Sequence, residues 1–191
     1  MEIVIHQKKI AIGDKYHIFT NQQFSHTASR QLFQLLAEIL LFNKQQSTPI
    51  LKINKRFYWF KAKYDIRVQD GAVLLFRTKS RWKRHYQCQT GTDHYDIYGH
   101  LGRKYSVYKN DIQIAWWKKG AITWFEGDNY VIAADDDSDR HLLIAFCLII
   151  DNMQGNHGEN ALTIHIGHMG LQSKKFDSDW LPKGTSENSH L

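Results

Sequence analysis

The sequence predicts a mostly β fold with two helices: an antiparallel β-barrel of repeated hairpins that encloses one apolar helix near the C-terminus. Three observations predict it. A strand-turn-strand unit recurs along the chain, turn signals separate closely spaced strands, and the run Leu142–Ile150 is apolar throughout. At 191 residues the chain fits one domain, whose core needs neither metals nor disulfides to be stable.

Each repeated unit has a strand rich in β-branched residues, a basic turn, and a second strand that contains a tyrosine. Three copies are clear, and a fourth is weaker. The pairs of segments are Ile3–Ile10 with Lys15–Ile18, Ile50–Phe57 with Lys63–Ile66, Ile112–Lys119 with Asn129–Ile132 and, for the weaker copy, Val73–Phe76 with His85–Cys88.

Turn-forming sequences between these strands indicate antiparallel pairing. Asp70-Gly71 is a strong hairpin signal, and Gly99–Gly102 and Lys109–Asp111 separate further strands. Because no helical pattern lies between these strands, the chain from residue 50 to about residue 134 is expected to form a continuous antiparallel meander.

Two segments break the β pattern, and the first lies between Ser25 and Asn43. Its apolar residues recur at helical spacing, and Ser25 or Thr27 could serve as the N-cap. We therefore expect a helical insert over residues 25–43 that packs on the outside of the sheet. The apolar residues are Leu32, Phe33, Leu35, Leu36, Ile39, Leu40 and Phe42.

The second segment predicts a helix over residues 139–153, with a buried strand as the alternative for so short an apolar run. Carboxylates in Asp135–Asp139 precede it, where they oppose the positive end of a helix dipole, and Gly155 follows as a stop signal. A helix that is apolar on every side must be enclosed by protein, and a curved sheet would enclose it.

We expect a barrel domain over residues 1–155 and a C-terminal extension over 156–191 that is partly disordered. Cys88 and Cys147 lie far apart and are expected to be buried, reduced thiols. With no secretory signal or membrane-spanning run in view, the expected location is the cytoplasm, as a protein that can lie peripheral to a membrane.

The repeated Ile-x-Ile, Lys-Lys/Arg and Tyr-x-Ile hairpins, followed by the Asp-rich segment and Leu142–Ile150, resemble the tubby C-terminal-like superfamily. The resemblance covers about residues 1–153. It is specifically to the LURP-one-related branch, to which phospholipid scramblases are also similar. It implies a barrel of about twelve antiparallel strands around a central helix, and tubby domains bind phosphoinositides through basic residues. The helical insert and the extension depart from that pattern.

No strong enzyme motif is present: the sequence lacks a phosphate-binding loop, a His-Glu-x-x-His pair, a nucleophile elbow and a Cys-x-x-Cys pair. His157, His165 and His168 in the extension leave open an enzyme or metal-binding site there, although zinc would require further ligands. We expect no cofactor. The acidic run Asp135–Asp139 fits a helix start better than a calcium loop.

Basic side chains concentrate in the middle of the chain, where residues 50–132 carry sixteen basic and seven acidic side chains. Three turns there combine cations with aromatic rings, at residues 55–61, 77–84 and 116–119. Gathered on one end of a barrel, they would form a patch for an anionic ligand. The predicted binding residues are Lys55, Arg56, Lys79, Arg81, Lys83, Arg84, Lys118 and Lys119.

The favoured function is a non-catalytic binding or scaffold module that meets anionic lipid headgroups or a membrane surface. A protein partner is also open, and a nucleic acid is a weaker alternative that would use the same patch through phosphate contacts and base stacking. Charges that only protect strand edges remain the simplest explanation of the pattern.

Overall fold

The computed structural model describes residues 1–9, 14–31, 38–56, 62–69, 71–81, 83–120, 129–155 and 174–184. Within them the chain forms twelve strands, one short 3-10 helix and one α-helix. The strands are β1 (Glu2–Lys9), β2 (Asp14–Thr20), β3 (Gln23–Gln31), β4 (Glu38–Asn43), β5 (Leu51–Arg56), β6 (Lys63–Val68), β7 (Val73–Ser80), β8 (His85–Thr90), β9 (Asp93–Gly99), β10 (Lys104–Lys109), β11 (Ile112–Lys119) and β12 (Asn129–Ala134). The helices are η1 (Leu101–Arg103) and α1 (Arg140–Gly155).

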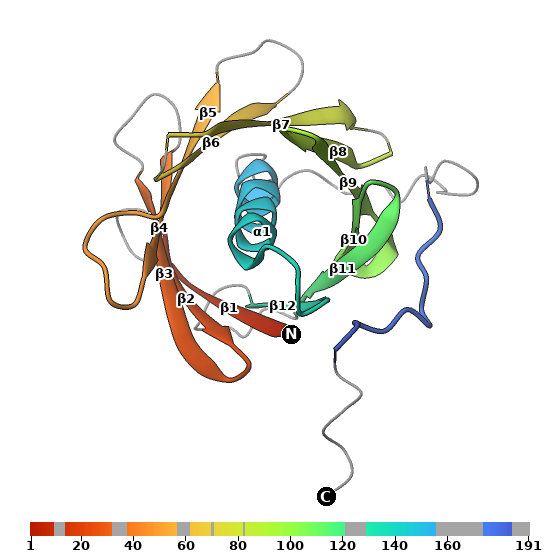
Figure 1. Ribbon diagram of the computed structural model, residues 1–191, viewed down its shortest axis with the longest axis horizontal. Coiled ribbons are helices and arrows are strands. Elements are labelled where there is room, and N and C mark those ends of the chain that lie inside the picture. Colours follow the sequence, from red (N-terminus) through yellow and green to blue (C-terminus); the bar gives the residue numbers. More distant parts are fainter. Residues whose placement is uncertain are drawn as a thin grey trace, which may run out of the picture.

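The strands form a closed antiparallel barrel in which every strand pairs with its neighbours in the sequence and β1 pairs with β12 to close the ring (Figure 1). The repeated units are confirmed as the hairpins β1–β2, β5–β6, β7–β8 and β11–β12. Full closure leaves no unpaired sheet edge, which an open sheet of this size would expose.

The predicted helix over residues 25–43 is wrong, because β3 and β4 occupy its described part. In β4, Ile39 and Leu41 are buried while Leu40 and Phe42 are only partly buried, which is the alternation of a strand. The same residues also satisfy helical spacing, so periodicity could not separate the two structures. Pairing of β3 with β2 and of β4 with β5 selects the strands over the helix, because the barrel closes only if β3 and β4 lie between β2 and β5.

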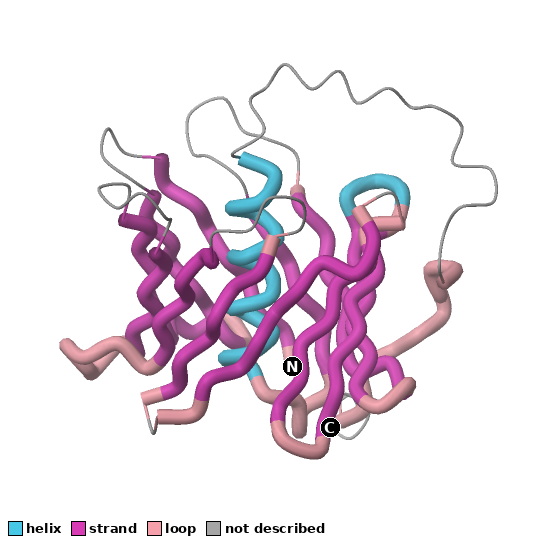
Figure 2. Tube along the Cα trace, turned by 90° about the horizontal axis from the view of Figure 1, so that it is seen from above, coloured by secondary structure: helices cyan, strands magenta, loops and turns pink. Residues whose placement is uncertain are grey.

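Helix α1 runs along the barrel axis, as predicted, with strands on every side (Figures 1 and 2). Asp139 caps it, since its Oδ1 accepts hydrogen bonds from the backbone N–H groups of His141 at 2.9 Å and Leu142 at 3.1 Å. All residues from Leu142 to Ile150 are buried. Phe146 packs against rings of the barrel wall, with centroid distances of 5.8 Å to Phe76 and 5.5 Å to Tyr95.

No helix in the described part of the chain combines the length and the apolarity needed to cross a membrane. Cys88 on β8 and Cys147 on α1 are free and buried, which confirms the expectation for both thiols. Burial raises the pKa of Cys88 to about 12 and that of Cys147 well above its usual value, so both stay protonated at neutral pH.

Part of the C-terminal extension lies along the outside of the barrel beside β10 and β11 (Figure 1). The ring of Phe176 contacts those of His100 and Trp116, at centroid distances of 5.2 and 5.8 Å. The backbone N–H of Lys183 donates to Asp135 Oδ1 at 2.6 Å. The division of the chain at residue 155 stays a prediction, as does the disorder expected for part of residues 156–191.

A pair of histidines, His26 buried and His141 partly buried, joins β3 to the start of α1. His26 Nε2 lies 3.1 Å from His141 Nε2, and burial, followed by the nearby His141 and Arg140, lowers the pKa of His26 from 6.5 to about 4. Between pH 6.5 and about pH 4, His26 therefore binds a proton in the unfolded chain but not in the folded chain. The contribution of His26 to the free energy of unfolding is fully present above pH 6.5. It falls by at most about 1.4 kcal/mol per pH unit as the pH is lowered to 4.

We therefore expect the free energy of unfolding, measured in urea at pH 7, 6 and 5, to fall less steeply for His26→Asn than for the unchanged protein. Some slope should remain, because burial also lowers the pKa of His100 to about 4. His17→Asn is the matched control, since His17 is exposed on β2. Equal slopes for His26→Asn and the unchanged protein would contradict this explanation.

Candidate functional site

The connections of the barrel separate into two sets at opposite ends. In an up-and-down barrel, every connection from an odd-numbered strand to the next even-numbered strand lies at the same end. Because α1 follows β12, it starts at the opposite end and its last residues reach the first end (Figure 2). We call the first end, where β1, β3, β5, β7, β9 and β11 finish, the basic end.

All eight predicted binding residues lie at the basic end, because each flanks a connection from β5 to β6, β7 to β8 or β11 to β12. The predicted gathering of the basic turns on one end is therefore present in the fold. Three of these side chains are partly buried: Lys55, Arg84 and Lys119. The other five are exposed: Arg56, Lys79, Arg81, Lys83 and Lys118.

Two of the arginines are fixed by neighbouring groups. Arg56 Nε donates to Asp65 Oδ2 at 2.8 Å, and this hydrogen bond and the charge of Asp65 raise the pKa of the guanidinium. Arg84 donates to the carbonyl oxygen of His100 and lies over the ring of Tyr105, 5.9 Å from its centroid. These arginines are held in place before any ligand arrives.

Further basic residues, which the sequence pattern does not single out, also lie at this end. Each of them flanks a connection from an odd-numbered to an even-numbered strand. Its position at the basic end therefore follows from the order of the strands, and the sequence of one turn does not reveal it. These residues are Lys8, Lys15, Lys63, Arg103 and Lys104. Lys8, Lys15 and Arg103 are exposed.

The opposite end carries half of the acidic residues of the described part of the chain, seven of fourteen. They lie in the turns from even to odd strands, at the start of β1 and in the segment before α1. The set comprises Glu2, Asp93, Asp111, Asp135, Asp136, Asp137 and Asp139. The barrel is therefore electrically polar along the axis of α1.

Only some of the aromatic residues of the predicted patch are among the residues that the structure describes. Phe57–Lys61 and Trp82 lie outside the described residues. Trp117 faces the barrel interior, where it stacks on Tyr105 at a centroid distance of 5.0 Å. Trp116 is partly buried and faces outward, where its ring meets that of Phe176 edge to face at a centroid distance of 5.8 Å.

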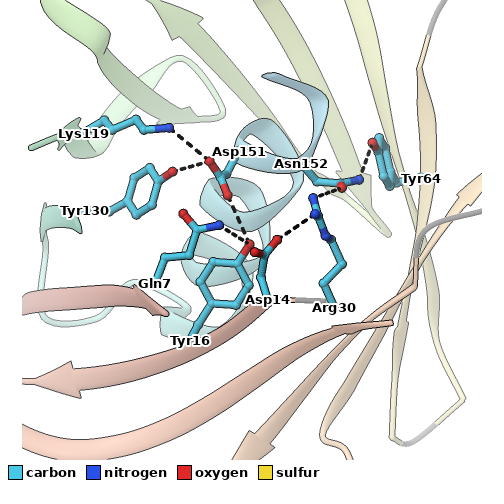
Figure 3. Close-up of polar contacts among 9 residues, drawn as sticks. All are labelled: Gln7, Asp14, Tyr16, Arg30, Tyr64, Lys119, Tyr130, Asp151 and Asn152. Atoms are coloured by element: carbon cyan, nitrogen blue, oxygen red, sulfur yellow. Dashed lines mark hydrogen bonds and ion pairs between the residues drawn. The ribbon is translucent and has the colours of Figure 1, made fainter. Parts of the chain in front are cut away.

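Beneath the basic end, the last turn of α1 carries a buried polar cluster (Figure 3). Asp151 is buried and accepts hydrogen bonds from Tyr16 Oη at 3.1 Å and from Tyr130 Oη. Lys119 Nζ lies 3.3 Å from Asp151 Oδ1. Lys119 thus points into the barrel and forms an ion pair with Asp151 of the helix, although it was predicted to bind an anionic ligand.

The neighbouring residue Asn152 extends this cluster to the other side of the barrel. It accepts a hydrogen bond from Arg30 at 3.1 Å and donates one to Tyr64 Oη at 3.1 Å. Arg30 in turn forms an ion pair with Asp14 at 2.8 Å. Together, the contacts of Asp151 and Asn152 tie five strands, β2, β3, β6, β11 and β12, to the polar end of the central helix (Figure 3).

The tyrosines of this cluster are those of the repeated unit. Tyr16, Tyr64 and Tyr130 occupy equivalent places near the starts of β2, β6 and β12, and Tyr105 on β10 accepts a hydrogen bond from Gln154 at 2.5 Å. The repeat therefore marks side chains that hydrogen bond to the end of α1. The sequence contains both parts of this cluster, the repeated tyrosines and the polar residues Asp151 and Asn152 that follow the apolar run. Periodicity alone does not show that the tyrosines contact these two residues.

The cluster is better suited to holding the helix than to catalysis. Burial raises the pKa of Tyr64 to about 12, and burial together with Asp151 raises that of Tyr16 well above its usual value. Both hydroxyls are therefore protonated at neutral pH and are neither nucleophiles nor bases. The alternative site at His157, His165 and His168 lies outside the described residues and stays a prediction.

In a comparison with known families, residues 1–151 match the family model described as LURP-one-related. The match begins at the first residue before β1 and ends at Asp151 in the last part of α1, so it spans both the barrel wall and most of its central helix. Comparisons with curated proteins and with solved structures gave no match.

Proposed function

Because the chain belongs to the LURP-one-related family, part of the tubby C-terminal-like superfamily, we propose that it is a non-catalytic binding module whose basic end meets an anionic membrane surface. The family is not a known enzyme family. The proposal also places the protein at the cytoplasmic leaflet, which carries the anionic lipids of the cell membrane.

The observation that carries the proposal is the concentration of basic side chains at one end of the barrel, whereas the other end carries both acidic residues and exposed cations. A planar anionic surface attracts the basic end more strongly than the opposite end, so binding also orients the molecule. Each lysine or arginine near such a surface contributes roughly 1 kcal/mol, and several exposed ones add up to stable but salt-sensitive binding.

A nucleic acid is the second candidate for the same charges. Proteins that bind single strands combine basic grooves with aromatic rings on which the bases stack. Among the described residues of the basic end, Trp117 and Tyr105 are buried and stack on each other, so they are closed to a base. These two rings therefore give no support to the nucleic-acid alternative.

The test is co-sedimentation with vesicles of phosphatidylcholine alone and with an added fraction of phosphatidylserine. We expect binding only to the anionic vesicles, with a steep loss on adding salt. In the variant Lys83→Gln/Arg103→Gln/Lys118→Gln the partition coefficient should fall by about 10- to 100-fold, because three exposed charges are lost from the basic end.

The matched control is Lys44→Gln/Lys52→Gln/Arg67→Gln, which removes the same charge from exposed residues near the other end. It should change the partition coefficient by less than about threefold. Equal losses in the two triple variants would show that only net charge matters. Binding to a single-stranded oligonucleotide but not to anionic vesicles would favour the nucleic-acid alternative.

A further inference from the structure

A cluster of potential metal ligands lies at the end of the barrel opposite the basic end. It consists of His94 and Asp96 on β9 and Asp111 in the turn between β10 and β11. The turn is fixed against β9, because the backbone N–H of Asn110 donates to the carbonyl of His94 at 3.0 Å and the N–H of His94 donates to Asn110 Oδ1 at 3.0 Å. Two neighbouring strands thus bring the three side chains together.

The ligand atoms of these residues all lie within 4.8 Å of one another. His94 Nε2 and Asp96 Oδ2 are 3.4 Å apart. Two ligands of a tetrahedral ion with bonds of about 2.1 Å are separated by about 3.4 Å, so this pair already has the required spacing. The carboxylate of Asp111 is exposed and can approach by a small side-chain movement.

The environment of Asp96 provides a second, independent observation. Its side chain is only 8% exposed, yet within the described residues no lysine or arginine pairs with it. Its Oδ1 accepts hydrogen bonds from His85 Nε2 at 2.6 Å and Gln87 Nε2 at 2.7 Å. Among the described residues its Oδ2 accepts none, and this oxygen faces His94.

A buried carboxylate beside a second carboxylate is unfavourable unless a positive charge compensates them. A divalent cation between Asp96 and Asp111 supplies that charge. His85 and Gln87 then act as the outer hydrogen-bond donors that orient a ligating carboxylate. Asp93 is not available as a ligand, because Lys109 at 2.8 Å and Asn110 at 2.9 Å already bind it.

We propose that His94, Asp96 and Asp111 bind one divalent transition-metal ion, with Zn²⁺ as the best match. An imidazole nitrogen favours Zn²⁺ over Ca²⁺ or Mg²⁺, which take oxygen ligands. Water completes the coordination on the exposed side. The bound ion connects β9 to the β10–β11 turn, so it stabilises the barrel at the end remote from the proposed membrane contact.

Calorimetric titration of the full chain with Zn²⁺ tests the site. We expect about one equivalent bound and a rise in the melting temperature, because the ion binds the folded chain. His94→Ala and Asp111→Asn should each weaken binding by at least tenfold. Both positions are at the surface, so these variants should fold.

The control variants His17→Ala and Asp137→Asn change exposed residues of the same types outside the cluster, and they should bind Zn²⁺ as the unchanged protein does. Absence of binding by the unchanged protein would overturn the proposal. It would also be overturned by undiminished affinity in both His94→Ala and Asp111→Asn, the result expected if zinc binds His157, His165 or His168 instead.

Discussion

Phe146→Ala is expected to lower the free energy of unfolding by about 3–5 kcal/mol, the usual cost of removing a buried aromatic ring and leaving a cavity. The ring is fully buried at the middle of α1 and packs on Phe76 and Tyr95 from the barrel wall. Strands on every side restrict collapse around the cavity, so the loss should lie toward the upper part of that range.

Urea unfolding followed by tryptophan fluorescence measures this loss. Leu181→Ala is the control, because that side chain is 79% exposed in the C-terminal segment and its removal should cost less than about 0.5 kcal/mol. A loss below about 1.5 kcal/mol for Phe146→Ala would mean that the helix is not enclosed.

A second large loss in the free energy of unfolding is expected when Asp151, at the polar end of the same helix, is changed. Asp151→Asn keeps the shape of the side chain but removes the negative charge that Lys119 faces at 3.3 Å. Leaving one partner of a buried ion pair costs about 3–5 kcal/mol, reduced where the remaining charge can reach water. We expect a loss of about 2–4 kcal/mol, because Lys119 lies close to the rim of the barrel.

The double variant Asp151→Asn/Lys119→Gln separates this pairing from a general loss of packing. If the charge pair causes the effect, the double variant should recover part of the stability that Asp151→Asn loses. Asp137→Asn, which neutralises an exposed aspartate, is the control and should change stability by less than about 0.5 kcal/mol. Losses that simply add in the double variant would show that the two charges act independently.

The sequence was sufficient to predict the enclosed helix, because a run that is apolar on every side has no stable place on a surface. Asp139 could be recognised as its cap for the same local reason: a carboxylate before such a run can accept the first free N–H groups. The hairpin repeats could also be predicted, since strand alternation and turn residues are local signals.

The structure of residues 25–43 could not be predicted in this way. The apolar residues of β4 fit both a helix and a strand, and the outcome depends on pairing with β2 and β5, which lie elsewhere in the chain. Lys119 illustrates the same limit for the candidate site. Its neighbour Lys118 faces solvent, and only the register of β11 decides which of the two lysines points into the barrel.

The tyrosines can be recognised in the sequence as a repeat, but their hydrogen bonds to the end of α1 can be seen only in the folded structure. Tyr16 and Tyr130 reach Asp151 only because β2 and β12 both begin at the end where α1 finishes. The convergence of the basic turns has the same cause, since strand order places all odd-to-even connections together.

Depth-dependent fluorescence quenching tests most directly whether the basic end contacts the membrane. A fluorophore is attached to a cysteine introduced at Arg103 or at Lys44, at opposite ends of the barrel, and anionic vesicles contain lipids brominated near the headgroup. Strong quenching at position 103 and little at position 44 is the predicted result. Equal quenching at both positions, or stronger quenching at position 44, would contradict binding through the basic end.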